Sequence, residues 1–376
     1  MAVALGPKPL SVHIVGSWSR PGWLSSSSVS DALGPPGHFW RVAPAHLSEA
    51  QDDATRLAVA DQLRCDVDLV TDGEQRRQMF DQYFYGRLSG VDADHRVRHR
   101  WGGPHTTPRD DSWRKLAVGD GPPGLSPEIP SPQVVGPVSW PGPLSVRDFE
   151  LLQRELSGRR PGKMAISGPV TAMNRMHDAF YHDPVRLGMA LAEALNAEAH
   201  ALADTGCRFI QLDEPEFRSA HLDFPELAKD AINAAVRGLR ERGVTTLAHM
   251  CYGYANAVQD KRVNPEFYGA LELLASTHID AISLEYAQPG HRPDVLAAAG
   301  SKGVVLGAVS CDPASAVESP AEVAARLRGA LSMVPPERLH ASTDCGVWFL
   351  PRAVAMGKLD SLVEGTRIVR RELNLE

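Results

Sequence analysis

Cysteine is scarce in this sequence: a chain of 376 residues contains five, at positions 65, 207, 251, 311 and 345. Their odd number and wide spacing argue against a disulfide framework and favour a reducing, cytoplasmic compartment. Long apolar runs are also lacking, and none approaches the roughly 18 residues that cross a bilayer. The start, Met1 to Leu10, lacks the charged-then-apolar layout of a signal peptide. We therefore expect no membrane partner.

A concentration of basic residues is missing as well. The chain has 39 Lys and Arg against 46 Asp and Glu, a formal net charge of −7. No basic stripe appears, which argues against a nucleic-acid partner. The hydrophobic share of 43% is ordinary for a globular protein. The length exceeds the usual single core and suits either one barrel with long loops or two domains.

Short apolar runs recur along the chain, and each ends in polar or small residues. Eight of them are predicted strands: Val12–Gly16, Val67–Thr71, Lys163–Ser167, Arg208–Leu212, Thr245–His249, Ala281–Leu284, Val304–Val309 and Leu339–Thr343. Helix-like segments separate most of these runs. The alternation predicts an α/β protein, a single (β/α)₈ TIM barrel over residues 1–376. An open doubly wound sheet is the alternative that the same alternation permits.

Two predicted helices have clear boundary signals. The first runs from Asp183 to Asp204, with Asp183 as the N-cap, Pro184 in the first turn and Gly206 just past the end. The second runs from Pro225 to Arg242 and stops at Gly243.

One stretch interrupts the alternation. Residues 86–144 are rich in Pro, Gly, Trp, Arg and His, and include Trp101-Gly-Gly-Pro and Gly121-Pro-Pro-Gly. We interpret this stretch as a long βα insertion that covers the barrel mouth or contributes to a partner contact, because loops of this length are usually functional or mobile. Disorder is the alternative.

Four residues that follow or end predicted strands have the chemistry of a zinc site. They are His249, Cys251, Glu285 and Cys345. Zn²⁺ prefers four N, S or O ligands of this kind. His249 and Cys251 are two apart, which places both side chains on one face of an extended segment. In a barrel all four positions meet at the carboxyl-end rim. The alternative is that these residues end strands by coincidence, since His-x-Cys alone is a weak signal.

Several motifs in order resemble the catalytic domain of the cobalamin-independent methionine synthases and their relatives. They are Val15-Gly-Ser17, Thr71-Asp-Gly-Glu74, Gly168-Pro-Val-Thr171, Gln211-Leu-Asp-Glu-Pro215, residues 245–253, Asp344-Cys-Gly346 and the tail Lys358-Leu…Val363-Glu-Gly. The resemblance extends from about residue 12 to residue 372. The full-length folate-dependent synthases have two barrels, so this chain resembles a short member with the catalytic barrel only.

The resemblance implies roles for particular residues. It makes His249, Cys251, Glu285 and Cys345 the ligands of Zn²⁺. Glu74 and Asp213 match positions that hold the amino group of homocysteine, and Val15, Gly16 and Ser17 match a segment that holds its carboxylate. Read without the resemblance, the Asp-Gly-Glu at 72–74 is a plain turn and Asp213 a capping carboxylate at a strand-to-loop junction.

Two departures concern the methyl donor. Arg175 stands where the folate-dependent enzymes carry a tryptophan thought to stack on folate. Where they carry a proton-donating histidine, this sequence reads Val309-Ser-Cys-Asp312, which makes Asp312 the nearest candidate for a catalytic acid. Cys311 is a further thiol, either a core residue or a redox or metal-linked group. These changes argue against a polyglutamyl methylfolate donor and favour a methylcorrinoid, or a corrinoid protein, or another small alkyl donor.

Three functions remain open at this point. The first is a core-type methionine synthase that moves a methyl group onto homocysteine. The second is a related zinc-dependent thiol alkyltransferase, for example one that opens an epoxide with coenzyme M or acts in secondary metabolism. Glu74 and Asp213 favour an amino-acid thiol, because a sulfonate thiol offers them no ammonium. The third is a non-catalytic barrel stabilised by zinc, in which four protein ligands would close the site.

Overall fold

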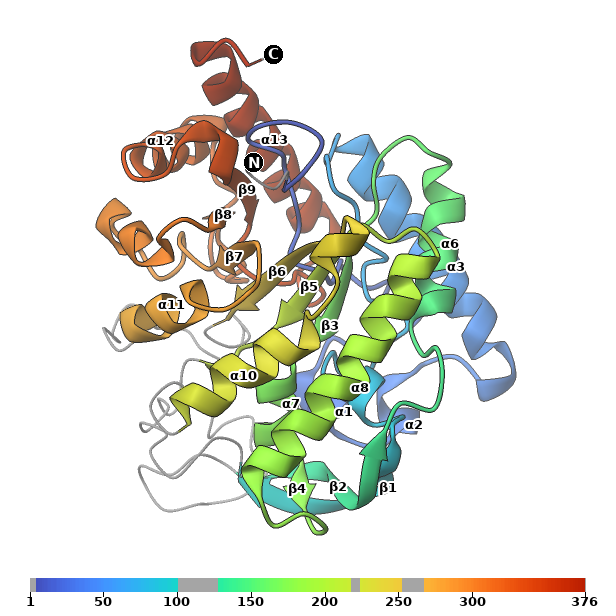
Figure 1. Cartoon of the computed structure of the whole chain (residues 1–376). Helices are drawn as coiled ribbons and strands as arrows, with labels where there is room; N and C mark the ends of the chain where they lie inside the picture. Colours follow the sequence, from blue (N-terminus) through green and yellow to red (C-terminus); the bar gives the residue numbers. More distant parts are fainter. Residues whose placement is uncertain (1–4, 101–127, 218–223, 252–266, 376) are drawn as a thin grey trace.

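The centre of the molecule is a parallel sheet (Figure 1). The computed structural model describes residues 5–100, 128–217, 224–251 and 267–375. Six strands lie in the order β3 (Met164–Ser167), β5 (Phe209–Asp213), β6 (Thr245–Met250), β7 (Ala281–Leu284), β8 (Gly303–Val309) and β9 (Leu339–Thr343). Each adjacent pair is parallel. Each strand agrees with one of the last six predicted runs to within one residue at either end.

The first two predicted runs form isolated parallel bridges rather than continuous strands. The amide of His13 donates to the carbonyl oxygen of Ala341 in β9 at 2.8 Å, and His13 also bridges to Leu69. Lys163, directly before β3, donates its amide to Val70 at 2.8 Å. These links join the last strand to the first through both runs, in the order of a (β/α)₈ barrel. The barrel prediction is confirmed, and the open doubly wound alternative is wrong.

A buried carboxylate reinforces this closure. Asp68, in the second run, accepts hydrogen bonds at Oδ2 from the Val12 amide (2.9 Å) and from Arg370 Nη2 (2.6 Å). Its Oδ1 lies 2.8 Å from Lys8 Nζ. Arg370 belongs to α13 (Arg352–Glu372), so one side chain ties two neighbouring runs to the last helix. Two cations offset the cost of burying this charge.

The remaining helices lie around the sheet (Figure 1). The shorter ones are α1 (Val29–Leu33), α2 (Pro36–Phe39), α4 (Gln82–Tyr85), α7 (Pro169–Arg175) and α11 (Phe267–Ala275). The longer ones are α3 (Pro44–Arg64), α6 (Val146–Leu156), α8 (Pro184–Asp204), α10 (Pro225–Ala235) and α12 (Pro320–Leu331). Three 3₁₀ turns are η1 (Arg240–Arg242), η2 (Pro293–Ala299) and η3 (Pro336–Arg338).

The two helices with clear sequence signals differ in outcome. Helix α8 begins as predicted, with the Asp183 carboxylate accepting from the amides of Val185 and Arg186. Helix α10 ends at Ala235, seven residues before the predicted Arg242. Gly238 adopts a φ of +76°, which an α-helix cannot continue through. Just before it, the Arg237 carbonyl oxygen accepts from side chains of α8 rather than from a helix turn.

Within the predicted insertion, 86–144, the described residues form part of a second sheet. Strand β1 (Ser89–Arg100) pairs antiparallel with β2 (Glu128–Ser139), and β2 pairs parallel with β4 (His177–Asp178). The imidazole Nε2 of His99 lies 3.3 Å from the carbonyl oxygen of Asn174 in α7, so β1 contacts a helix that follows a barrel strand. The motifs at 101–104 and 121–124 lie outside the described residues.

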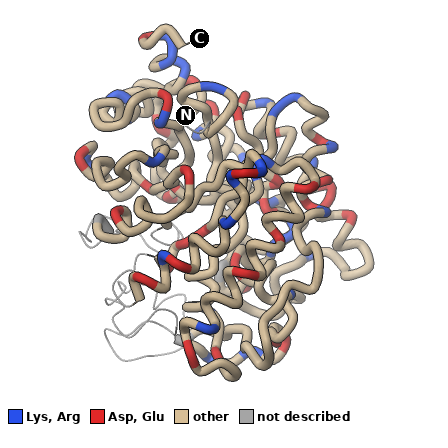
Figure 2. Tube along the Cα trace, in the orientation of Figure 1, with Lys and Arg blue, Asp and Glu red and all other residues tan. Residues whose placement is uncertain are grey.

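Charged residues of both signs are interspersed along the described trace (Figure 2). Among the described residues, no helix is long and apolar enough to cross a membrane.

Removing the α8 cap tests the predicted helix boundary. Asp183→Ala should lower the free energy of unfolding by about 1 kcal/mol, because two first-turn amides lose their acceptor. Urea denaturation monitored by circular dichroism measures the change. The control is Glu193→Ala on the same helix, whose exposed pair with Arg237 should contribute less than about 1 kcal/mol. Equal stability of wild type and Asp183→Ala would contradict the assignment.

Candidate metal centre and substrate pocket

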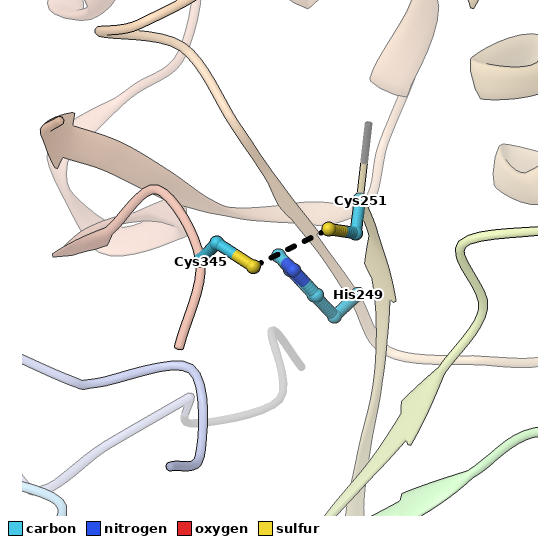
Figure 3. Close-up of side chains that lie close together, drawn as sticks. All are labelled: His249, Cys251 and Cys345. Atoms are coloured by element: carbon cyan, nitrogen blue, oxygen red, sulfur yellow. Dashed lines mark hydrogen bonds between the residues drawn. The ribbon is translucent and has the colours of Figure 1, made fainter. Parts of the chain in front are cut away.

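Three potential metal ligands converge at the carboxyl ends of the strands. His249 lies in β6, Cys251 directly follows it, and Cys345 follows β9. Their ligand atoms all lie within 4.8 Å of one another, and all three residues are buried. The two sulfur atoms point toward each other at 3.3 Å beside the His249 ring (Figure 3). One imidazole and two thiols within reach of a single point form a donor set that suits Zn²⁺.

Glu285, the fourth predicted ligand, lies at the edge of this cluster. It follows β7 and is fully buried, and its Oε1 accepts from Cys251 Sγ at 3.1 Å. The ring orientation of His249 is set by a contact of 3.0 Å between its Nδ1 and the Ser283 hydroxyl in β7. Coordination of a metal by His249 would therefore use Nε2, a division of roles common for metal-binding histidines.

Two residues beside the cluster position its ligands. Asp344 precedes Cys345 and accepts from the amides of Tyr286 (2.8 Å), Ala287 (2.9 Å) and Gln288 (2.6 Å), so it fixes the loop that follows Glu285. Burial, and next the charge of Glu285, raise the pKa of Asp344 to about 7. Cys311 brackets the backbone of Cys345: its Sγ donates to the carbonyl oxygen at 3.1 Å and accepts from the amide at 3.3 Å.

A pocket opens over the cluster and holds about 610 Å³ of empty space, open solvent included. Its lining combines the cluster with residues from the loops after several strands. The lining residues are Val15, Ser17, Arg20, Glu74, Gln78, Phe80, Arg175, Asp213, Pro215, His249, Cys251, Cys345, Gly346 and Trp348. Among the predicted binding residues, Val15, Ser17, Glu74 and Asp213 belong to this wall.

Gly16 is present where a side chain could not fit. A Cβ on Gly16 would lie 2.3 Å from Glu74 Oε1, so only glycine allows this carboxylate to lie against the backbone of the 15–17 segment. Ser17 is similarly close to Gly346, where a Cβ would lie 2.0 Å from Ser17 Oγ. The segment therefore contacts both the predicted amino-group site and the loop that carries Cys345.

The pocket floor concentrates buried charge. Burial, and next the charge of Glu74, raise the pKa of Asp213 to about 7, and burial raises the pKa of Glu74 as well. Lys163 lies beneath them with its pKa lowered to about 7 by burial. Its Nζ donates to Gln211 Oε1 at 2.6 Å, and Gln211 donates in turn to Asp213 Oδ1 at 2.7 Å. A bound ammonium group beside Glu74 and Asp213 would favour their ionised forms.

Arg175, the residue at the folate-stacking position of the resembled enzymes, also lines the pocket. Its guanidinium bonds Glu216 Oε1 at 3.0 and 3.2 Å and Asp81 Oδ2 at 3.2 Å, and lies 5.1 Å from the centroid of the Phe80 ring. Two carboxylates thus compensate one buried cation. The side chain is held in place and presents no aromatic face to the pocket.

Asp312 lies outside the pocket lining. Its carboxylate accepts from the Ala314 amide at 2.9 Å, and the residue is half-buried in the loop after β8. Sequence reasoning assigned no role to Arg20, Trp348 or Asp344. Asp344 had a usable signal, because it stands between a strand and a predicted ligand. Arg20 and Trp348 lie in irregular loops, where periodicity gives no information about contacts.

The sequence is similar to a family of known proteins and to individual members of it. The family described as "Cobalamin-independent synthase, Catalytic domain" matches residues 125–367. A "Methionine synthase" of Sulfurisphaera tokodaii is 29% identical over 365 residues, covering 97% of this chain and 94% of the relative. A "Methionine synthase" of Thermococcus kodakarensis is 28% identical, with 98% and 95% covered.

Solved structures agree with the sequence comparison. A B12-independent methionine synthase from Shewanella sp. W3-18-1, in complex with selenomethionine, is 30% identical with a TM-score of 0.81, and covers 98% of this chain and 99% of its own. A Listeria monocytogenes structure, described as a putative vitamin-B12 independent methionine synthase, is 21% identical with a TM-score of 0.69, covering 96% and 98%, and supports the fold alone.

Proposed function

Because the chain belongs to the cobalamin-independent synthase family, as a member of its catalytic-domain type, we propose that it transfers a methyl group to the sulfur of homocysteine and so forms methionine. The observation that carries this proposal is the pocket in which two carboxylates, Glu74 and Asp213, share a wall with His249, Cys251 and Cys345. The ammonium group of an amino-acid thiol would contact the two carboxylates. Its sulfur would lie at the end of the pocket that contains Cys251 and Cys345.

The proposed acceptor fits the pocket at both ends. The ammonium of homocysteine would lie between Glu74 and Asp213, and its carboxylate beside the backbone of residues 15–17. The Shewanella relative is described in complex with selenomethionine, an analogue of the proposed product. Burying the carboxylates of the pocket floor costs free energy. A non-catalytic barrel stabilised by zinc would not explain why they are buried there.

We propose that the metal is Zn²⁺, held by His249, Cys251 and Cys345 with Glu285 as the fourth ligand. Support comes from the N/S donor set and from the closeness of Glu285 Oε1 to Cys251 Sγ, 3.1 Å. When bound, zinc lowers the pKa of the substrate thiol and maintains a thiolate at neutral pH. Glu285, the hardest of the four, would be the most readily exchanged of these ligands.

The protein's own residues contribute position and charge. Glu74 and Asp213 would orient the amino acid so that its sulfur lies beside the cluster of His249, Cys251 and Cys345, which leaves the open side of the pocket to the donor. The new bond joins sulfur to the methyl carbon, and the bond between that carbon and the donor breaks with its electron pair on the donor atom. Only a nitrogen leaving group, as on a methylfolate, would also need a proton. Asp312, the candidate acid, would have to supply it from outside the pocket lining, in the loop after β8. Arg175 argues against a stacked folate donor and favours a methylcorrinoid.

The test is methionine formation by zinc-loaded protein given homocysteine with methylcobalamin, and in parallel with a methylfolate. We expect methionine with methylcobalamin and little with methylfolate. Methionine with methylfolate alone would overturn the donor assignment. No methionine from either donor, in protein that holds zinc, would direct attention to the related alkyltransferases that use other thiols.

Replacing the sulfur ligands tests the metal centre. Cys251→Ser and Cys345→Ser should each remove most of the bound zinc and abolish methyl transfer, because the hydroxyl is a much poorer ligand than thiolate. Elemental analysis of dialysed protein gives the zinc content. Cys65→Ser is the matched control, since Cys65 lies at the end of α3 outside the cluster. Full zinc content in both cluster variants would exclude this site.

Neutralising the floor carboxylates tests the binding of the amino group. Glu74→Gln and Asp213→Asn should each raise the KM for homocysteine about 10-fold or more, the loss expected for a charged hydrogen bond. With a pKa of about 7, Asp213 loses its charge as pH falls, so kcat/KM of the wild type should drop below neutral pH. The drop should be shallower in Asp213→Asn. Asp204→Asn, at the exposed end of α8, is the control and should change neither.

A further inference from the structure

A second groove adjoins the substrate pocket. It is lined mainly by residues of the segments 19–27 and 348–352, and it holds about 1050 Å³ of empty space, open solvent included. Arg20 and Trp348 line both the groove and the pocket. The guanidinium of Arg20 lies 5.0 Å from the Trp348 ring centroid, so this pair forms the wall that the two spaces share. The groove therefore lies next to the site of the proposed reaction.

The groove has a fixed backbone. Ser25 and Trp40 form an antiparallel bridge, the Ser26 amide donates to Phe39 at 2.8 Å, and the Arg41 amide donates to Leu24 at 2.9 Å. This pairing holds the serine-rich turn against the segment that carries Arg41. These hydrogen bonds within the protein fix the wall, which limits the entropy that binding must overcome.

The chemistry of the wall is aromatic and cationic. Trp23 exposes 51% of its surface, a large value for an indole, and Phe349 lines the groove nearby. Arg41 donates to the Gly22 carbonyl oxygen at 2.6 Å and, within the described part of the chain, forms no ion pair. Arg352, by contrast, is paired with Asp61. No Asp or Glu belongs to the lining. The wall thus suits an apolar body that carries an anionic group.

The wall of the groove also contains a buried hydroxyl. Ser25 lines the groove and is 3% exposed, and within the described residues its Oγ has no hydrogen-bond partner. A buried polar atom normally has a partner, because leaving it without one costs free energy.

We propose that this groove holds the body of the methyl donor, and that the donor combines a broad apolar body with an anionic group. The inference rests on the proposed function. The acceptor would occupy the end near Glu74 and Asp213, so the donor must approach from the open side. Its methyl group would reach the pocket past the wall formed by Arg20 and Trp348, while its body rests on Trp23 with its anionic group beside Arg41.

Direct binding, measured without turnover, tests the groove separately from the reaction. Equilibrium dialysis of zinc-loaded protein gives a Kd for methylcobalamin and another for N5-methyltetrahydrofolate, the two sources of this chemistry. Trp23→Ala and Arg41→Gln should each raise the Kd of the donor that binds about 10-fold or more, equivalent to about 1.4 kcal/mol. Ser25→Ala should raise it less. The KM for homocysteine should stay unchanged in all three variants.

The controls are Phe180→Ala and Arg237→Gln, an exposed aromatic and an exposed arginine outside both cavities. They should leave the Kd at the wild-type value. An unchanged Kd in Trp23→Ala and Arg41→Gln would overturn the proposal, and so would the failure of both donors to bind wild-type protein at millimolar concentration. Weakened binding in these variants, in protein that forms no methionine, would support the groove while rejecting the proposed function.

Discussion

The site depends on the parallel register of the barrel strands. Asp213 lies beside His249 in the pairing of β5 with β6, and His249 lies beside Ser283 in the pairing of β6 with β7. Parallel strands in register end at the same level, so the residues that follow them meet at one rim. A slip of one residue would turn each of these side chains to the other face of the sheet. The closing links from His13 to β9 and from Lys163 to Val70 preserve that register around the ring.

This arrangement buries charged side chains, which costs free energy. The buried charged groups are hydrogen-bonded to neighbouring groups. Lys163 and Gln211 support Asp213 from below, Asp344 takes three backbone amides, and Arg175 is held by two carboxylates. Burial raises the pKa of Asp213, and that of Glu74 beside it in the pocket lining, so at these two carboxyl groups burial outweighs the neighbouring contacts. A pocket with this imbalance is prepared to bind a cation, which is the charge of the proposed substrate's amino group.

The proposed donor side differs from the proposed acceptor side in chemistry and in the elements that form it. The acceptor side consists of strand ends and the residues next to them, and it is lined by carboxylates and thiols. The donor side consists of irregular loops with arginine against an aromatic ring, as in the contact of Arg20 with Trp348. In the proposed reaction, strand ends would hold the groups that act at sulfur, while the loops would contact the donor.

The sequence by itself determined the strands, the class of fold and the capped start of α8, because hydrophobic periodicity and capping act over a few neighbouring residues. It placed the end of α10 seven residues too far, because the contacts that stop this helix come from α8, far away in the chain. Its motifs, through the family they resemble, indicated the four candidate ligands. Only the tertiary structure decided that Asp312 lies outside the pocket, that Arg175 is paired with Glu216 and Asp81, and that a groove adjoins the pocket at Arg20 and Trp348. Those facts depend on how loops pack across the barrel rim, and no local pattern encodes contacts between residues tens to hundreds of positions apart.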